Sequence, residues 1–372
     1  MKQIAAIAFL LAAWNLPGKN SANPVVVHEW GTFTSVAGVD GKSLPWAPLA
    51  GQADLPCFVY TTRRIQPKGA TWGLVRMETP VLYFYAQQPT TISVNVDFPQ
   101  GTITEWYPRS DAPDNLRVIP RSMKWKDIEV LPQAELTFPT GKSGSHYYAA
   151  RATDSAPLRI GDQQEKLIFY RGVGNFEVPL RPRITAEGKL EIRNAGFEAL
   201  PLAIAFENQA GKVGYQVLHD LRETVTLDVP ELTGDVATLQ QKLSAELVGF
   251  GLYPKEAAAM IATWRDSWFE EGMRVFYVMP RAQVDSILPL KTTPEASSVA
   301  RVFVGRVEVL SPRMRQTLTT AVTTGDSQKL VRIGRFLQAF EPQLATTQNM
   351  KVFLPSAEQA ILARWGSTAC VE

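Results

Sequence analysis

The feature that most constrains the fold is a long series of short apolar segments that runs from about Val25 to Val229. Pro, Gly, Asn and Asp separate these segments, a pattern that indicates β-strands joined by turns. In residues 91–99 apolar and polar side chains alternate, so one face of that strand is expected to be buried and the other solvated. Because many short strands follow one another at this spacing, we expect an antiparallel β-sandwich.

The apolar residues follow a helical period after residue 231. Asp235 can cap a first helix, and Pro254 suits the first position of a second helix, whose apolar stripe includes Trp264 and Trp268. Two later segments have the composition of strands, and the C-terminal residues are helical again. The sequence therefore predicts an α+β chain: an N-terminal antiparallel β-sandwich domain (residues 23–231), followed by a helix-rich C-terminal part with a few strands (residues 232–372) that packs on the sandwich.

Residues 1–22 have the pattern of a secretory signal peptide. Lys2 precedes an apolar run, Ile4–Trp14, and small residues after it offer a cleavage point. The run is too short to span a bilayer, although an uncleaved anchor is an alternative interpretation. We expect a periplasmic or secreted protein with no membrane span after removal of the signal.

The net charge of the mature chain indicates which classes of partner it can bind. Removal of residues 1–22 takes away two of the 38 basic side chains and none of the 36 acidic ones, so the mature chain is neutral. It has no basic run or stripe. Nucleic acid and anionic lipid surfaces are therefore not expected as partners.

The chain has two cysteines, Cys57 and Cys370. In an oxidising compartment they can form a disulfide that pins the C-terminus to the N-terminal part of the protein. The alternative is a buried thiol at one position and a thiol on a frayed tail at the other. The sequence leaves both possibilities open.

Three histidines provide the first candidate for chemistry: His28, His146 and His219. Three imidazoles can hold a catalytic zinc with one position open, and a neighbouring carboxylate, Glu29 or Asp220, can then act as a base. A strand, however, places His28 and Glu29 on opposite faces. The alternative is that each histidine is a structural or surface residue.

A second candidate is the carboxylate pair Asp266 and Glu270, which lie four residues apart and so share one face of the second helix. Two carboxylates between aromatic walls resemble a glycosidase site. Arg265 flanks this pair, or instead lies between sandwich and helix and bridges a carboxylate such as Glu78 or Glu105. The alternative is a solvated helix face opposite the tryptophan stripe.

Aromatic residues crowd the first third of the mature chain, and exposed rings can bind sugar rings. The candidate binding residues are Trp30, Trp106, Tyr107 and Tyr147, together with Arg265 from the helix. Packing in the core and between layers is the alternative for such large side chains.

Several longer motifs carry a resemblance: "VHEWGTFTS", "METPVLYFY", "DFPQGTITEWYP" and "TWRDSWFEEGMRVFYVMPR". Over almost all of the mature chain the sequence resembles a family of uncharacterised exported bacterial proteins that carry the HEWGTFTS motif. The resemblance implies export and supplies no activity and no catalytic residue. Cys57 stands where a glycine is expected in that family, so the resemblance does not support a shared disulfide.

Two hypotheses of different classes follow. The first is a non-catalytic envelope protein, or a β-sandwich that binds an extracytoplasmic polymer of the carbohydrate type. The alternative is a metal-dependent hydrolase of an extracytoplasmic substrate, with zinc held by His28, His146 and His219. The two hypotheses differ in one testable respect: only the hydrolase requires the three imidazoles to lie close enough together to share a metal ion.

Overall fold

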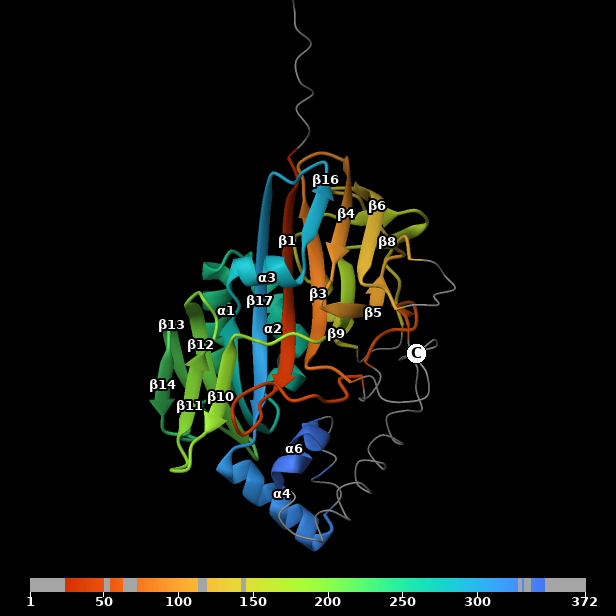
Figure 1. The fold of residues 1–372 in the computed structure, drawn as a ribbon. Helices are drawn as coiled ribbons and strands as arrows, with labels where there is room; N and C mark the ends of the chain where they lie inside the picture. The colour runs from red at the N-terminus through yellow and green to blue at the C-terminus, as the bar shows by residue number, and fades with distance from the viewer. Residues whose placement is uncertain are drawn as a thin grey trace, which may run out of the picture.

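Three β-sheets form the framework of the protein in the computed structural model (Figure 1). The structure describes residues 24–49, 54–62, 72–112, 119–141, 145–326, 330 and 336–344. The predicted signal peptide, residues 1–22, lies outside the described residues, and so does Cys370.

The largest sheet has nine strands, and its two central strands come from opposite ends of the chain. β1 and β17 run parallel, with Val26 opposite Ser298, whereas the other neighbours in this sheet are antiparallel. In spatial order the strands are β13 (Lys212–Leu221), β12 (Leu200–Gln209), β15 (Gly272–Val278), β17 (Ser298–Val309), β1 (Val26–Val36), β3 (Val75–Tyr85), β9 (Ile168–Gly174), β5 (Gly101–Tyr107) and β2 (Tyr60–Thr61).

Two smaller sheets and six described helices complete the fold. The five-stranded sheet contains β16 (Leu290–Thr293), β4 (Thr90–Asp97), β6 (Ser122–Val130), β7 (Leu158–Ile160) and β8 (Gln163–Glu165), and the three-stranded sheet contains β10 (Leu180–Ile184), β11 (Leu190–Asn194) and β14 (Thr224–Leu227). The helices are η1 (His146–Arg151), α1 (Val236–Gly249), α2 (Pro254–Trp268), α3 (Arg281–Ile287), α4 (Pro312–Thr324) and α6 (Leu337–Leu344). Among these helices, none combines the length and the apolar character that crossing a membrane requires.

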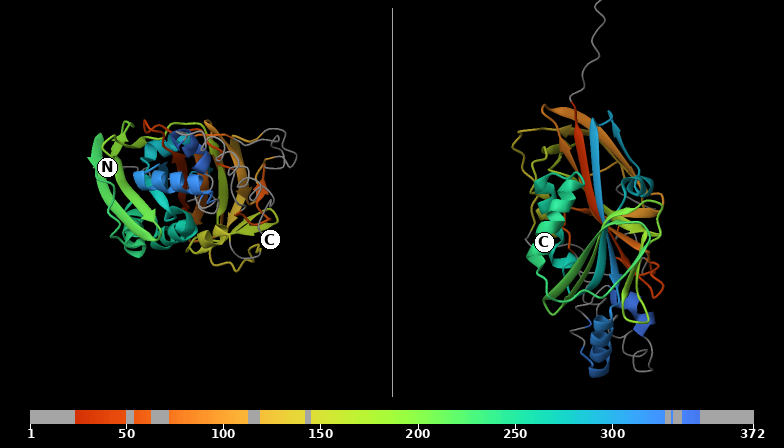
Figure 2. Two further views of the ribbon diagram at one scale, coloured as in Figure 1. Left: turned by 90° about the horizontal axis from the view of Figure 1, so that it is seen from below. Right: turned by 90° about the vertical axis from the view of Figure 1, so that its left-hand side faces the viewer.

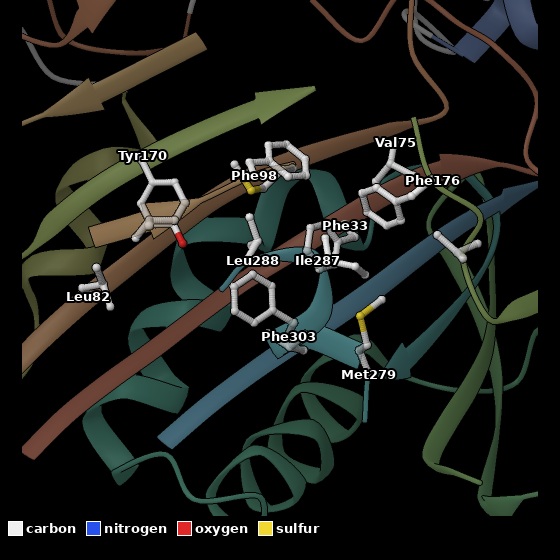
Figure 3. Packing of buried hydrophobic residues seen from close by; sticks show 14 of the residues in the cluster. Phe33, Val75, Leu82, Phe98, Tyr170, Phe176, Met279, Ile287, Leu288 and Phe303 are labelled. Atoms are coloured by element: carbon white, nitrogen blue, oxygen red, sulfur yellow. The ribbon is translucent and has the colours of Figure 1, made fainter. Parts of the chain in front are cut away.

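The nine-stranded sheet is buried on both faces. One face packs on α1 and α2 through a core that includes Trp30, Leu243 and Trp264, and Figure 2 shows these helices against the sheet. The other face packs on the two smaller sheets. Figure 3 shows part of this second core, in which Phe33 of β1 stacks on Phe303 of β17 with ring centroids 5.1 Å apart.

The predicted fold class is wrong. Of the residues that the structure describes, 43% lie in strands and 22% in helices, and this part of the chain shows no separate helix-rich C-terminal part. β15 and β17, which follow residue 232, are inner strands of the main sheet, and β17 pairs with the first strand of the chain. The periodicity of a segment indicates which of its faces is buried, but it does not indicate which strand pairs with it. Local patterns therefore did not predict the pairing of β17 with β1.

Several local predictions are confirmed. The Asp235 carboxylate accepts hydrogen bonds from two backbone amides at the start of α1. Trp264 and Trp268 of α2 face the sheet and are 6% and 0% exposed. In β4 the alternating apolar residues are buried, as expected for a strand with one solvated face.

Candidate functional site

His28 of β1 lies against the first turn of α2, where it meets a buried carboxylate. Its Nδ1 is 2.8 Å from Oε2 of Glu256, and the two residues are 4% and 0% exposed. Because a carboxylate only accepts, Nδ1 of His28 is the donor in this hydrogen bond. The strand and the helix are joined here by residues 228 positions apart in the sequence.

Glu256 accepts three hydrogen bonds. Besides His28, the donors are the hydroxyl of Tyr85, at 2.8 Å from Oε1, and the backbone N–H of Tyr253, at 2.7 Å from Oε2. The last bond satisfies an amide at the start of α2 that has no partner within the helix. The pKa of Tyr85 is raised above its ordinary value, mainly by burial and secondly by the Glu256 carboxylate. Its hydroxyl therefore stays a donor.

Tyr253, the residue before α2, presents an aromatic ring to solvent from this cluster. Its ring centroid lies 4.4 Å from that of His28 and 4.8 Å from that of Tyr85, which it meets edge-on at 83°. The residue is nevertheless 43% exposed. Two side chains that Glu256 itself fixes therefore pack against the ring of this exposed residue.

The pair of His28 and Glu256 has the arrangement of a general base and its orienting carboxylate. A nucleophile would have to hydrogen-bond to Nε2, and within the described part of the chain Nε2 has no hydrogen-bond partner. The described residues thus form a rigid support for Tyr253, and they do not form a nucleophile–base pair.

Glu29 lies on the opposite face of β1 from His28, as the pleat predicts. Its carboxylate accepts from the hydroxyl of Tyr170 and is 2.5 Å from Nε of Arg301. All of these groups lie in the core between the sheets, and Arg301 also donates to Asp285 at 2.7 Å. Glu29 therefore neutralises a buried arginine and is not positioned as a base beside His28.

The structure does not bring the three histidines together. His219 is on β13, where its Nε2 lies 2.8 Å from Glu246 of α1 and its side chain is 60% exposed. His146 begins η1 and is half-buried. The described residues contain no group of three histidine, cysteine, aspartate or glutamate side chains that can hold a metal ion, so the three-histidine zinc site is not formed.

The other predicted catalytic carboxylates contact arginines. Asp220 forms two hydrogen bonds at 2.9 Å with Arg222 at the surface. Asp266 pairs with its neighbour Arg265, and both side chains are about two-thirds exposed, at 65% and 69%. Glu270 instead accepts from buried Arg306 at 2.6 Å. Asp266 and Arg265 thus lie on a solvated helix face, and Glu270 belongs to a salt bridge.

The predicted aromatic platform is not at the surface. Trp30, Trp106, Tyr107 and Tyr147 are 0%, 5%, 4% and 2% exposed, so all four pack in the cores. Tyr147 donates its hydroxyl to Glu165 at 2.9 Å. Large rings release more free energy when they are buried than small side chains do, which explains this outcome.

Cys57 is disulfide-bonded. The residue predicted to be its partner, Cys370, lies outside the described residues, so the pairing itself stays a prediction.

Sequence reasoning missed Tyr253 and Glu256, although both stand in a recognisable helix start. Glu256 follows Tyr253 by three residues, which is the spacing at which a glutamate returns to the amide before a helix. That signal predicts the hydrogen bond to the backbone. It does not predict His28, which reaches Glu256 only because β1 is central in the sheet.

Comparison with known proteins adds little. No family model matches the chain, and no curated protein matches its sequence. The yeast delta-COP-I mu-homology domain in complex with a Dsl1 WxWxV peptide is similar at 7% identity and a TM-score of 0.29, over 77% of this chain and 96% of that chain. A second structure of that domain gives 8% identity and a TM-score of 0.28 over the same shares. Similarity this low carries no argument about fold or function.

Proposed function

We propose that this β-rich protein is an exported, non-catalytic binding protein of the cell envelope that holds a carbohydrate polymer against the ring of Tyr253. The observation that carries the proposal is that Tyr253 is 43% exposed while its ring packs against His28 and Tyr85, with ring centroids 4.4 Å and 4.8 Å away. A ring that is already fixed loses little conformational entropy when a ligand covers it.

The hydrogen bonds of Glu256 support this role. They fix the hydroxyl of Tyr85, the ring of His28 and the backbone of Tyr253 at the same time. The platform therefore keeps one orientation in the absence of ligand. The sequence resemblance to exported proteins, and the signal peptide that residues 1–22 predict, support a location of this surface outside the cytoplasm.

The contacts of the carboxylates favour binding over catalysis. Glu29 and Glu270 neutralise buried arginines, and Asp220 and Asp266 pair with arginines at the surface. A general acid or base has to be within hydrogen-bond reach of the substrate, and these carboxylates face protein partners instead.

A sedimentation assay tests the proposal. The mature chain is incubated with insoluble peptidoglycan, chitin and cellulose, and the protein that pellets with each polymer is measured. We expect binding to at least one polymer, Tyr253→Phe to retain it, and Tyr253→Ala to weaken it about fivefold to thirtyfold, as for a central aromatic contact.

The matched control is Trp72→Ala, because Trp72 is the most exposed tryptophan of the described residues at 50%. This variant should bind as the wild type does. Absence of binding to all three polymers, or equal losses for the two alanine variants, would contradict the proposal. Urea unfolding of Tyr253→Ala separates a lost contact from a lost fold.

A further inference from the structure

A second site lies far from Tyr253, in an open groove between the β10–β11 hairpin and α4. The groove has a volume of about 570 Å³, which is within the range of pockets that bind small ligands and short peptides. In Figure 1 the hairpin ends close to α4, at the lower end of the molecule. The described residues that line the groove are Ile184, Thr185, Ala186, Gly188, Leu310, Pro312, Arg315, Gln316, Thr319 and Thr320.

The backbone of Ile184 faces the free edge of β10. β10 is the outer strand of the three-stranded sheet. At the hairpin, Thr185 donates its N–H to Lys189 at 2.8 Å, and Ile184 is opposite Leu190. Because bonded and non-bonded pairs alternate in an antiparallel ladder, the N–H and C=O of Ile184 point away from β11. Among the described residues the Ile184 N–H has no hydrogen-bond partner.

The rest of this strand edge is protected. Pro182 has the same outward orientation as Ile184, two residues before it, and a proline has no N–H to donate. The Arg183 side chain pairs at 2.7 Å with Glu191, which is opposite it on β11. Proline and charged side chains are the usual protection of an edge strand, so pairing with another strand is restricted to the end of β10 that borders the groove.

The groove carries one charge. Arg315 is the one charged side chain among the described lining residues. One of its Nη atoms donates to the carbonyl of Gln343 at 2.5 Å. This bond fixes the guanidinium at the groove, and its other N–H groups are left to donate to a ligand. The nearby Glu187, at the hairpin tip, hydrogen-bonds to Thr185 and does not line the groove. The lining is otherwise aliphatic, hydroxyl or amide.

We propose that this groove binds an extended peptide with an acidic side chain, which adds a strand to β10 at Ile184 and places its carboxylate on Arg315. Strand addition supplies main-chain hydrogen bonds, and the aliphatic wall accepts alternate side chains. A guanidinium prefers a carboxylate as partner. Peptide is favoured over saccharide because the outward amide of Ile184 matches a strand and because the described lining has no aromatic ring.

The test uses the full mature chain and an N-acetylated, C-amidated peptide of alternating valine and glutamate, with binding measured by calorimetry. The same peptide with lysine in place of glutamate, and one with N-methylated amides, are the matched controls. We expect only the valine–glutamate peptide to bind, and Arg315→Gln to weaken it about tenfold to a hundredfold, the effect of a charge-assisted hydrogen bond.

Two further measurements address the strand edge. Ile184→Pro removes the outward N–H without removing a bond to β11, and should weaken binding about threefold to tenfold. In the wild type, bound peptide should slow hydrogen exchange of the Ile184 amide, a result that needs no variant. Thr323→Ala, on an exposed part of α4 outside the groove, should bind as the wild type does.

Several results would overturn the proposal. They are equal binding of the lysine peptide, equal binding of the N-methylated peptide, unchanged exchange at Ile184, or binding of oligogalacturonate to the groove with no binding of peptide. Loss of polymer binding at Tyr253 would leave this proposal standing, because the two sites share no residue.

Discussion

Glu256→Ala should be among the most destabilising single substitutions in the protein. The carboxylate is fully buried, and its removal leaves three donors without their acceptor: His28 Nδ1, the Tyr85 hydroxyl and the Tyr253 N–H. Removal of one partner from a buried ionic or hydrogen-bonded group costs about 3–5 kcal/mol. A domain is stable by only about 5–15 kcal/mol, so the variant is expected to lose a large part of its stability.

Glu256→Gln should cost less, about 1–3 kcal/mol, because the amide keeps the shape and one acceptor oxygen but turns an NH₂ group toward a donor. Urea unfolding followed by tryptophan fluorescence gives both values. A loss smaller than about 0.5 kcal/mol for Glu256→Ala would refute the reasoning, since it would mean that these donors find other partners.

A second histidine–glutamate pair provides a control for the effect of burial on the free energy of unfolding. His219 and Glu246 are also 2.8 Å apart, but the histidine side chain is 60% exposed and the glutamate 32%. Exposed pairs contribute about 0–1 kcal/mol. Glu246→Ala should therefore cost no more than about 1 kcal/mol. Equal losses for the two glutamates would show that burial is not the cause.

Two other predictions follow from the cores. Trp264→Ala should cost about 3–5 kcal/mol in urea unfolding, because Trp264 is 6% exposed and stacks on Trp268 at 6.4 Å; a cost below about 1 kcal/mol would contradict its place in the core. Burial raises the pKa of Tyr83, Tyr147 and Tyr170 well above the ordinary value of about 10. These raised pKa values belong to the folded state, whereas in the unfolded chain the same hydroxyls ionise near pH 10. The free energy of unfolding is therefore retained in full below pH 10 and falls as the pH rises above it. Absorbance at 295 nm during alkaline titration should show that these hydroxyls ionise only on unfolding, and titration of all native tyrosines near pH 10 would contradict the prediction.

The sequence predicted what depends on neighbouring residues. The cap at Asp235, the stripe of α2 and the alternation in β4 each follow from a few positions, and each is confirmed. It did not predict the arrangement of the sheet, because the parallel pairing of β1 with β17 joins residues about 270 positions apart. No local period encodes a partner at that distance.

The site was partly predictable for the same reason. The pleat correctly separates His28 from Glu29, because alternation along a strand is local. The partners of these residues, Glu256 and Arg301, are not local: one comes from α2 and the other from β17. The prediction of the aromatic platform was wrong because composition cannot tell a buried ring from an exposed one, and the exposed Tyr253 lies in the α1–α2 connection.

The adjacent residues of the HEW triplet are explained by the layers that they join. His28 fastens α2 to the sheet through Glu256, and Trp30 fills the core on that same face. On the other face Glu29 pairs with Arg301 of the neighbouring strand β17, and Arg301 in turn donates to Asp285 of α3. Through these side chains β1 contacts α2 directly on one face and is linked to α3 through Arg301 on the other. It follows that Glu29→Gln should destabilise the pairing with Arg301 and the contact with α3 while polymer binding at Tyr253 persists in the folded fraction, whereas His28→Ala should weaken both stability and binding, because His28, unlike Glu29, supports that ring.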